Sequence, residues 1–403
     1  MMASSDSKIL SELRGLVLRS AELRQEFART AAEVDARGVD PADNLRRLWE
    51  TGLNGISVPR AYGGLSDGTM GFGFEALTET VINVSAGEGS TGQIYFTQAL
   101  VARELLHPQV TLPETTRQQL AHEILQENVR FVSSNAEAGT SGRVTSRQVD
   151  GGIVLNGTKT FNTASGGARY ALVGHLLEGM AGMHMALVRL DDRAVKQHHD
   201  WDNMGQRATE SQTITYEEVF VPDGWHFHMP PLVGSLLIPL AFSMHGAMLL
   251  GIGRGAFDEM LAYVRKSQRT IFPSSKSSDE DPLMRLRVGD LSVTLAAAHA
   301  LQREVARQAE DVEEGMDITE LLIHASRAKV ASIEAALKVT NEMYELTGAR
   351  STASTYRFDR FWRDARTFSV QTPIDLRRLA VGVHELQGQM WSTTWDQAMR
   401  GRV

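Results

Sequence analysis

A short segment near the end of the chain combines charged, aromatic and neutral polar residues in a way typical of a reaction site. It reads RFWRDARTFSVQTP over residues 360–373. After Arg366 it contains no carboxylate, histidine or lysine, which are the side chains that exchange protons near neutral pH. Chemistry at this segment would therefore need no base, or would take one from another part of the chain.

Two stretches in the middle of the chain carry side chains suited to bind a small molecule. SSNAEAGTSGR offers Asn135 as its best hydrogen-bonding side chain. LNGTKTFNTAS follows, and we expect it to present Phe161, Asn162 and Thr163 at the end of a strand after a turn at Asn156-Gly157. Taken alone, each is an ordinary loop or hairpin.

A third pattern, WDNMGQRATES, sets Trp201 ahead of a turn at Gly205-Gln206-Arg207. The strand TITYEEVFVP follows it. An aromatic residue in this place can cover a bound ring or pack in the core, and the sequence supports both interpretations equally.

Composition narrows the classes of partner. The 403 residues are 42% hydrophobic and can bury a large core. A formal net charge of −8 without a long basic run argues against nucleic acid or a membrane surface as the main partner, so we expect a small molecule or a protein. The absence of cysteine excludes disulfides, thiolate metal sites and a cysteine nucleophile, and fits a cytoplasmic location. The N-terminus lacks the pattern of a secretion signal.

The periodicities divide the chain into three regions. Helical spacing predominates over residues 1–128, short strand-like runs over 129–232, and helical spacing again over 233–403. This order predicts an α+β, mainly α fold: an N-terminal helical domain, a central β domain and a C-terminal helical domain. We expect a hairpin turn at Asp150-Gly151-Gly152, a buried helix over 236–253, a capping box at Asp317 to Glu320, and a helix end at Gly348.

Several common chemistries are disfavoured by spacing. GIGRGA, residues 251–256, matches a dinucleotide fingerprint only in its glycines and lies in a helical region, so we expect close helix packing there. The twelve histidines are scattered without metal-ligand spacing, and we predict no metal site. There is no GxSxG motif and no P-loop.

The ordered series LNGTKTFNTA, WDNMGQRATES, VFVP, GIGRGAFDEMLAYVRKSQRT and RFWRDART resembles the acyl-CoA dehydrogenase superfamily. It extends over nearly the whole chain, from about residue 20 to 390. The resemblance implies an N-terminal helical domain, a central β domain and a C-terminal four-helix bundle. It also implies a homotetramer with flavin bound where the domains meet.

The resemblance does not carry over the base of the dehydrogenases. Those enzymes remove a proton with a glutamate, and the matching position here is Thr372, followed by Pro373. Other members place the glutamate on the first helix of the C-terminal domain, but this chain has no acidic residue between Asp223 and Asp258. A hydroxyl cannot replace a carboxylate as a general base, so we do not expect acyl-CoA dehydrogenation.

ELTGARSTASTYRFDRFWRDARTFS is similar to a second branch of the superfamily, the flavin-dependent monooxygenases that include dibenzothiophene monooxygenases and sugar nitrososynthases. These enzymes receive reduced flavin from a separate NAD(P)H-dependent reductase. They form a hydroperoxide on it with O2 and insert one oxygen atom into a small organic substrate. The protein's part is to bind, orient and exclude water.

Residue by residue, the resemblance assigns Asn135, Phe161, Asn162 and Thr163 to the flavin ring, with Trp201 over one face. Thr163 would donate to or accept from the central ring nitrogen. Arg269 and Arg350, the latter next to Ala349, would bind the phosphate, since guanidinium groups grip phosphate oxygens. FAD-using relatives have Gln-x-x-Gly-Gly where this chain has ELTGAR, so we predict reduced FMN, with reduced FAD as the alternative.

The missing histidines after the Arg-Thr pair disfavour hydroxylation of a phenol, which needs a base. We therefore expect oxygenation at nitrogen or sulfur, with Gln371 orienting flavin or substrate and Phe368 excluding water. Thr163, Gln371 and Tyr95 are the predicted catalytic residues. Gln93, Gln98 and His245 are further candidates for a base, although a helix places such residues in a core as often as in a pocket.

Some alternatives stay open on the sequence. Arg360, Asp364 and Arg366 are expected to form structural ion pairs. An aromatic ring hydroxylase of the same branch, an acyl-CoA dehydrogenase, and a catalytically silent scaffold that binds flavin or a partner are the competing functions.

Overall fold

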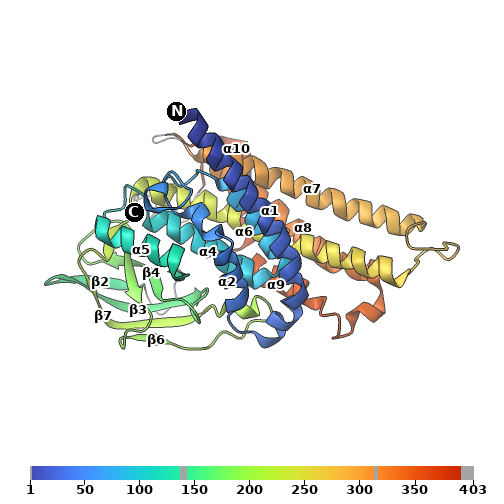
Figure 1. Cartoon of the computed structure of the whole chain (residues 1–403), viewed down its shortest axis with the longest axis horizontal. Helices are drawn as coiled ribbons and strands as arrows, with labels where there is room; N and C mark the ends of the chain where they lie inside the picture. The colour runs from blue at the N-terminus through green and yellow to red at the C-terminus, as the bar shows by residue number, and fades with distance from the viewer. Residues whose placement is uncertain (1, 137–142, 313–315, 392–403) are drawn as a thin grey trace.

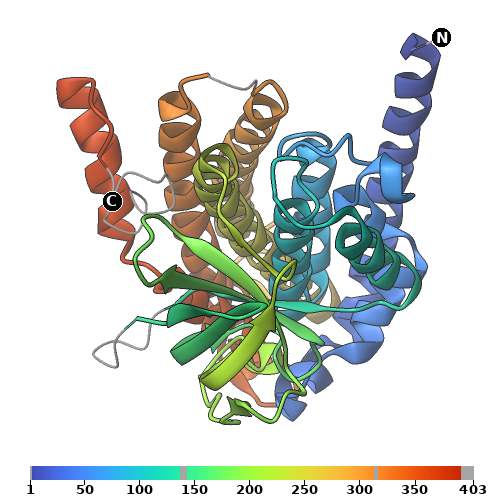
Figure 2. The ribbon, with the colours of Figure 1, turned by 90° about the vertical axis from the view of Figure 1, so that its left-hand side faces the viewer.

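The computed structural model describes residues 2–136, 143–312 and 316–391. Over these residues the chain forms helices, then strands, then helices, which confirms the predicted fold class (Figure 1). The first change falls between Gln126 and Phe131 and the second between His228 and Pro231. In Figure 2 the sheet lies in front, with the N-terminal helices on one side and the C-terminal helices on the other.

The N-terminal helices share one apolar core with the C-terminal helices. The former are α1 (Met2–Arg37), α2 (Ala42–Glu50), η1 (Leu53–Ser57), η2 (Arg60–Tyr62), α3 (Phe74–Gly87), α4 (Gly89–Leu105) and α5 (Glu114–Gln126). The latter are α6 (Pro231–Ser267), α7 (Pro282–Glu310), α8 (Thr319–Thr347), η5 (Ala349–Thr352), α9 (Asp359–Ser369) and α10 (Ile374–Gln387). Helix α6 is the centre of this core, because it packs against α3, α4, α7, α8 and α9.

The strands form one mixed sheet with its own small core. They are β1 (Phe131–Ser134), β2 (Thr145–Val149), β3 (Gly152–Asn162), β4 (Tyr170–Leu177), β5 (His184–Arg189), β6 (Val195–Gln197), β7 (Gln212–Pro222) and β8 (His226–His228). Their spatial order is β6-β7-β3-β2-β4-β5-β8, with β1 parallel to β4. The sheet brings the end of β3 next to the start of β7, where Asn162 pairs with Gln212.

Two helix starts show how local sequence sets the frame. The Glu88 carboxylate accepts from the Ser90 and Thr91 amides at 3.0 and 2.7 Å and so caps α4. At α7, Asp281 accepts from Leu283 and Met284. The free amides of a first helical turn prefer a carboxylate, so both starts are fixed in place.

The glycines of GIGRGA allow close helix packing, as predicted. A Cβ atom at Gly251 or Gly255 would collide with backbone oxygens of α3, those of Ile82 and Ala86. At Gly253 it would come within 3.0 Å of Ala336 in α8. This segment therefore packs helices and does not bind a dinucleotide.

Helix α6 is also long and apolar enough to cross a membrane by length and composition. However, 89% of its most apolar window is buried inside the protein. It is the buried helix that the sequence predicted over 236–253. Pro239 lies inside it without ending it.

Two local predictions were wrong and two were right. Asn156-Gly157 does not turn the chain but lies inside β3 at a register shift, because Gly157 with φ +133° accommodates a bulge. The capping box is also absent: Asp317 accepts from Thr319 at 2.9 Å, and no side chain caps α8 at Ile318. The turn between β2 and β3 at Gly151 and the helix end at Gly348 are confirmed.

Candidate functional site

Thr163, directly after β3, is the centre of a buried polar group to which α4, η4 (Arg207–Thr209) and the residue before β7 also contribute. Gln93 Nε2 donates to Thr163 Oγ1 at 2.9 Å, and Ser211 Oγ lies 3.0 Å from the same oxygen. Ser211 in turn lies 2.7 Å from Thr209 Oγ1. We call Gln93, Thr163, Thr209 and Ser211 the Thr163 group; all four side chains are buried.

Asn162, whose contact with flavin stays a prediction, has a side chain that is fully bonded within the protein. Its Oδ1 accepts from Ser134 Oγ at 2.6 Å, and its Nδ2 donates to the carbonyls of Lys159 and Gln212 at 2.9 Å each. The side chain is fully buried and its amide is engaged at both ends. These hydrogen bonds tie the end of β3 to the neighbouring strands, and they fix the position of the adjacent Thr163.

Phe161 and Trp201 lie side by side at the surface next to Thr163. Their ring centres are 6.2 Å apart in an edge-to-face arrangement, and Phe161 is 60% exposed. Phe161 also has a left-handed backbone, φ +55°, which is unusual for an aromatic residue and is often found at functional sites. Trp201 is fixed by a hydrogen bond from Nε1 to the Gln206 carbonyl at 3.0 Å. An exposed aromatic ring beside a buried polar group suits a planar ligand.

Asn135, directly after β1, has a further buried acceptor, which lies against Gly174 of β4. Its Nδ2 donates to Ser133 Oγ at 3.0 Å, while its Oδ1 is buried without a partner among the described residues. Buried polar atoms are nearly always paired, so an orphaned oxygen indicates a place for a ligand or water. Gln93 Oε1, on the side chain that bonds Thr163, is a second buried acceptor of this kind.

The predicted phosphate-binding arginines lie at the far end of α6 and α8. The guanidinium of Arg269 lies against Gly348, so closely that a Cβ atom there would displace it, and its Nη1 is buried without a partner among the described residues. Ala349 and Arg350 begin η5 and are exposed. Within the described residues no hydrogen bond or ion pair joins these arginines to the Thr163 group.

Gln371 lies in a second polar group, which we call the Lys329 group: His245, Lys329, Gln371 and Thr372. Lys329 Nζ is 3.0 Å from Thr372 Oγ1, 3.2 Å from His245 Nδ1 and 3.5 Å from Gln371 Oε1. Lys329 is 3% exposed, whereas Gln371 is exposed. Among the described residues no carboxylate forms an ion pair with Lys329.

Burial controls the protonation of this group. Desolvation, with a smaller contribution from the nearby Arg377, lowers the pKa of Lys329 to about 7. Burial, followed by the charge of Lys329, also lowers the pKa of His245 well below its ordinary value. At neutral pH His245 is a neutral acceptor, and Lys329 is the group that can gain or lose a proton.

Helix α4 connects the two groups. Gln93 belongs to the Thr163 group, and Phe96, three residues later on the same face of the helix, packs on His245 and Phe368. The ring centres of His245 and Phe368 are 5.1 Å apart. One face of α4 therefore runs from the proposed flavin position to a wall built by Phe96, Phe368 and His245.

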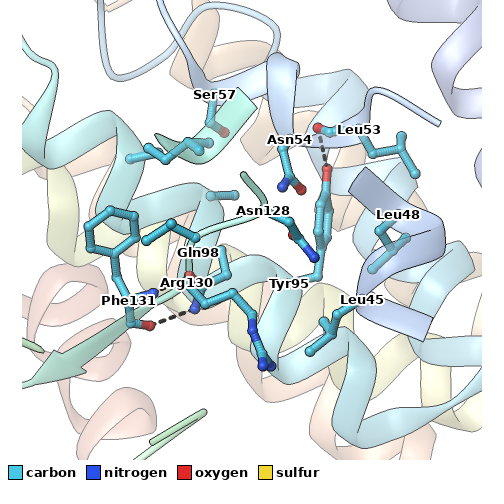
Figure 3. A pocket seen from close by; sticks show the side chains of 14 residues that line it. Leu45, Leu48, Leu53, Asn54, Ser57, Tyr95, Gln98, Asn128, Arg130 and Phe131 are labelled. Carbon is cyan, nitrogen blue, oxygen red and sulfur yellow. Dashed lines mark hydrogen bonds between the residues drawn. The ribbon is translucent and has the colours of Figure 1, made fainter. Parts of the chain in front are cut away.

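Tyr95 was predicted to be catalytic, but it faces away from both groups. Its hydroxyl donates to the Leu53 carbonyl at 3.0 Å, as Figure 3 shows, and the side chain is buried. The cavity beside it has a volume of about 20 Å³, enough for about one water molecule. Gln98 lines the same cavity and pairs with both backbone groups of Phe131 at 2.6 Å. Residues two positions apart lie on different faces of a helix. Because Gln93 faces Thr163, Tyr95 points away from the Thr163 group.

The ion pairs expected around RFWRDAR are only partly present. Arg360 pairs with Glu259, as expected. Asp364 forms no ion pair among the described residues: its carboxyl accepts from the Gln206 amide at 2.6 Å in a fully buried position. Burial, and then the negative charge of Glu88, raises the pKa of Asp364 to about 8. Arg366 is exposed, and its side chain forms no hydrogen bond or ion pair with a described residue, while its carbonyl accepts from Ser369 Oγ at 2.9 Å.

Lys329 is the residue that the sequence prediction missed. In α8 it lies in a buried stripe with Leu322, Ala325, Ser332 and Ala336, at helical spacing. A single lysine within an apolar stripe was the signal available in the sequence, because lysine is almost never fully buried without a reason.

These residues fit a reduced flavin. An exposed aromatic pair, buried open acceptors at Gln93 and Asn135, and a guanidinium with an unpaired buried nitrogen at Arg269 are complementary to a planar ring with N–H groups and to a phosphate.

Comparison with known proteins gives relatives over most of the chain. Dibenzothiophene monooxygenase from Rhodococcus erythropolis is 29% identical over 395 residues, which cover 91% of this chain and 92% of that protein. The probable FMNH2-dependent monooxygenase SfnC from Pseudomonas putida is 29% identical over 380 residues, with the same shares. The crystal structure of FMN-bound TdsC from Paenibacillus sp. A11-2 has a TM-score of 0.86 at 23% identity and covers 94% of this chain and 99% of its own. That likeness shows the fold.

Two family models match the two helical parts of the chain. The acyl-CoA dehydrogenase N-terminal domain matches residues 18–108, and the acyl-CoA dehydrogenase C-terminal domain matches residues 243–373. Together the matches cover more than half of the chain and include α4, Lys329 and Gln371. The chain thus belongs to the acyl-CoA dehydrogenase family.

Proposed function

We propose that this protein is the oxygenase component of a two-component system: a monooxygenase that uses reduced FMN and O2 to insert one oxygen atom into a small sulfur-containing molecule. The observation that carries the proposal is the composition of the Lys329 group. Where dehydrogenases of this family have a glutamate, Thr372 and Gln371 meet Lys329 and His245, and no carboxylate joins them among the described residues. Removal of a carbon-bound proton is not supported here, whereas oxygenation of a sulfur lone pair needs no such base.

Bound reduced FMN would supply the activation of oxygen. The chain's own residues would hold and shield it. Thr163 would fix the central ring, Phe161 and Trp201 would cover it, and Arg269, with Ala349 and Arg350 beside it, would bind the phosphate. Gln371, at the exposed edge of the Lys329 group, would orient the substrate, and the Phe96–Phe368–His245 wall would exclude water.

Sulfur is favoured over nitrogen by the relatives. The curated relatives that match over 91% of the chain include monooxygenases named for dibenzothiophene, a sulfur heterocycle. SfnC is described as FMNH2-dependent, which supports FMN over FAD.

The remaining parts of the proposal concern assembly. The family resemblance supports a homotetramer, in which a second copy would contribute to the flavin site. A separate NAD(P)H-dependent reductase would deliver the flavin in the cytoplasm. The division into domains at 1–128, 129–232 and 233–403 also stays a proposal.

A stopped-flow experiment tests the function. FMN is reduced under anaerobic conditions, mixed with the protein, and then mixed with oxygenated buffer, while the return of oxidised-flavin absorbance at 450 nm is followed. We expect reoxidation to be much slower than for free flavin, and to accelerate when a thioether such as dibenzothiophene is added with formation of its sulfoxide. Reoxidation at the free-flavin rate with no sulfoxide would refute the proposal.

A second arm separates the dehydrogenase. Purified protein loaded with oxidised FAD is mixed with an acyl-CoA without oxygen. Bleaching of the flavin would establish dehydrogenation, and we expect none, because the Lys329 group has no carboxylate to start it.

A further inference from the structure

The hydroxyl of Thr163 lies in a chain of hydrogen bonds whose direction can be determined. Thr209 Oγ1 is 2.8 Å from the carbonyl oxygen of Gln206, which can only accept, so the single hydroxyl proton of Thr209 points there. Ser211 Oγ is 2.7 Å from Thr209 Oγ1. Because Thr209 has no second proton, Ser211 must be the donor in this contact.

The same count fixes the next two contacts. Thr163 Oγ1 is 3.0 Å from Ser211 Oγ, and the only proton of Ser211 is already used, so Thr163 donates to Ser211. Thr163 then has no proton left for Gln93. The Gln93 amide must therefore present its Nε2 to Thr163, at 2.9 Å, and turn its Oε1 away.

Two atoms remain open at this point, and both are acceptors. The Thr163 oxygen has two lone pairs, of which Gln93 uses one. Gln93 Oε1 is buried and has no partner among the described residues. A buried acceptor without a donor is costly, so this part of the site is complementary to a ligand that brings an N–H group.

We propose that Ser211 and Thr209 hold Thr163 as a hydrogen-bond acceptor, and that they thereby make the site select reduced flavin over oxidised flavin. This inference rests on the proposed function, because it places the flavin ring at Thr163. The central ring nitrogen carries a proton in reduced flavin but only a lone pair in oxidised flavin. A hydroxyl that accepts can therefore bind the N–H of reduced flavin. Against oxidised flavin its lone pair would face the lone pair of the ring nitrogen.

The arrangement has a use in a two-component system. Such an enzyme must capture the reduced form that the reductase supplies and release the oxidised form that remains after the reaction. Ser211 and Thr209 are positioning residues here, since they act on the flavin only through Thr163. If the Thr163 proton were not donated to Ser211, the hydroxyl could either donate or accept, and the site would bind reduced and oxidised flavin with similar affinity.

Dissociation constants for the two forms of FMN test this polarity directly. Oxidised FMN is titrated by fluorescence quenching, and FMN reduced with dithionite is titrated by anaerobic calorimetry, with the full-length protein. We expect the wild type to bind reduced FMN more tightly. In Ser211→Ala the proton of Thr163 is released and can be donated to the oxidised ring, so the affinity for oxidised FMN should rise about fivefold and the preference should shrink by the same factor.

Thr209→Val gives an independent check that leaves Thr163 and Ser211 unsubstituted. It removes the acceptor of the Ser211 proton, so Ser211 can donate to Thr163 and the direction of the hydrogen bonds can reverse. It should reduce the preference in the same direction. Ser326→Ala is the matched control: Ser326 is equally buried, and its hydroxyl donates only to the Leu322 carbonyl within α8, at 2.8 Å. It should leave both dissociation constants unchanged.

The outcomes separate this inference from the function. Unchanged preference in both Ser211→Ala and Thr209→Val, with normal sulfoxide formation, would overturn the inference alone. Failure of the wild type to bind either form of FMN would overturn the proposed function and the inference with it. A preference that falls in both variants, and not in Ser326→Ala, supports the polarity.

Discussion

Replacing Lys329 by methionine should change how the stability of the protein depends on pH. Methionine fills a similar volume but carries no charge. In the folded protein burial lowers the pKa of Lys329 to about 7, while in the unfolded chain lysine has its ordinary value near 10.4. Between these values the unfolded chain binds more protons than the folded one, so the free energy of unfolding rises with pH.

The size of the effect follows from the two values. Above pH 7 the folded lysine is largely neutral, and each pH unit adds about 1.4 kcal/mol to the free energy of unfolding. Between pH 6 and pH 9 the wild type should therefore gain about 2.5 kcal/mol that comes from Lys329. In Lys329→Met this gain should be absent. The free energy of unfolding of the variant, relative to that of the wild type, should be highest at pH 6, where the buried charge of Lys329 destabilises the wild type most.

Urea denaturation at pH 6, 7, 8 and 9, followed by tryptophan fluorescence, measures the difference between the two proteins. Lys196→Met, which removes an exposed lysine on β6, is the control and should show a constant difference over the same range. A difference between Lys329→Met and the wild type that does not vary with pH would show that Lys329 is charged throughout, and the assignment of Lys329 as the titrating group would fail.

Three further changes test other parts of the structure. Burial, and then the charge of Glu88, raises the pKa of Asp364 to about 8. The contribution of Asp364 to the free energy of unfolding should therefore fall by up to about 1.4 kcal/mol per pH unit between pH 5 and pH 8. Asp364→Asn should remove this contribution, so the difference between variant and wild type in the same urea series should vary with pH, and a constant difference would contradict it. Burial, and then the charge of His184, lowers the pKa of His175 to about 3. The contribution of His175 to the free energy of unfolding should therefore fall as the pH drops below 6.5. In thermal melts between pH 4 and pH 7, His175→Asn should gain stability relative to the wild type as the pH falls. Gly255→Ala should lower the free energy of unfolding by about 3 kcal/mol, because the added Cβ would collide with the Ala86 carbonyl. Gly289→Ala in α7, where a Cβ has no neighbour within 4 Å, should raise it by up to about 1 kcal/mol. Equal melting temperatures for the two variants would refute the close packing of α3 and α6.

The sequence predicted the layers of the fold because periodicity reports burial. The helix, strand, helix order and the buried helix in α6 could be read from apolar spacing alone. Turn chemistry was less certain, because the same Asn-Gly pair that favours a hairpin can also accommodate a bulge. Asn156-Gly157 does so inside β3, where the long pairing with β7 outweighs the local preference.

Side-chain direction limited the prediction of the site. Thr163 and Phe161 could be placed by resemblance, but the choice among Gln93, Tyr95 and Gln98 depended on the rotation of α4, which sequence spacing does not give. The structure turns Gln93 toward Thr163 and Tyr95 toward Leu53. Asn162 shows the same limit: its side-chain amide bonds two backbone carbonyls, and its contact with flavin stays a prediction.

Lys329 also shows why the segment after Arg366 contains no base of its own. The proton-exchanging side chain comes from α8 and lies 3.0 Å from the Thr372 hydroxyl. The segment after α9 is therefore held against α8 by an amino group whose neighbours are a hydroxyl, an amide and a neutral histidine. The pKa of about 7 leaves part of Lys329 neutral at neutral pH, but its Nζ is buried among these three side chains and the Phe242 ring, which lies 4.9 Å away. This enclosure, and not its charge, keeps Lys329 from a substrate carbon. What the group can do is hold Gln371 at its exposed edge and Phe368 against Phe96, and this orients a substrate without removing a proton from it. A substrate that reacts through its own lone pair is the one for which such a site is sufficient.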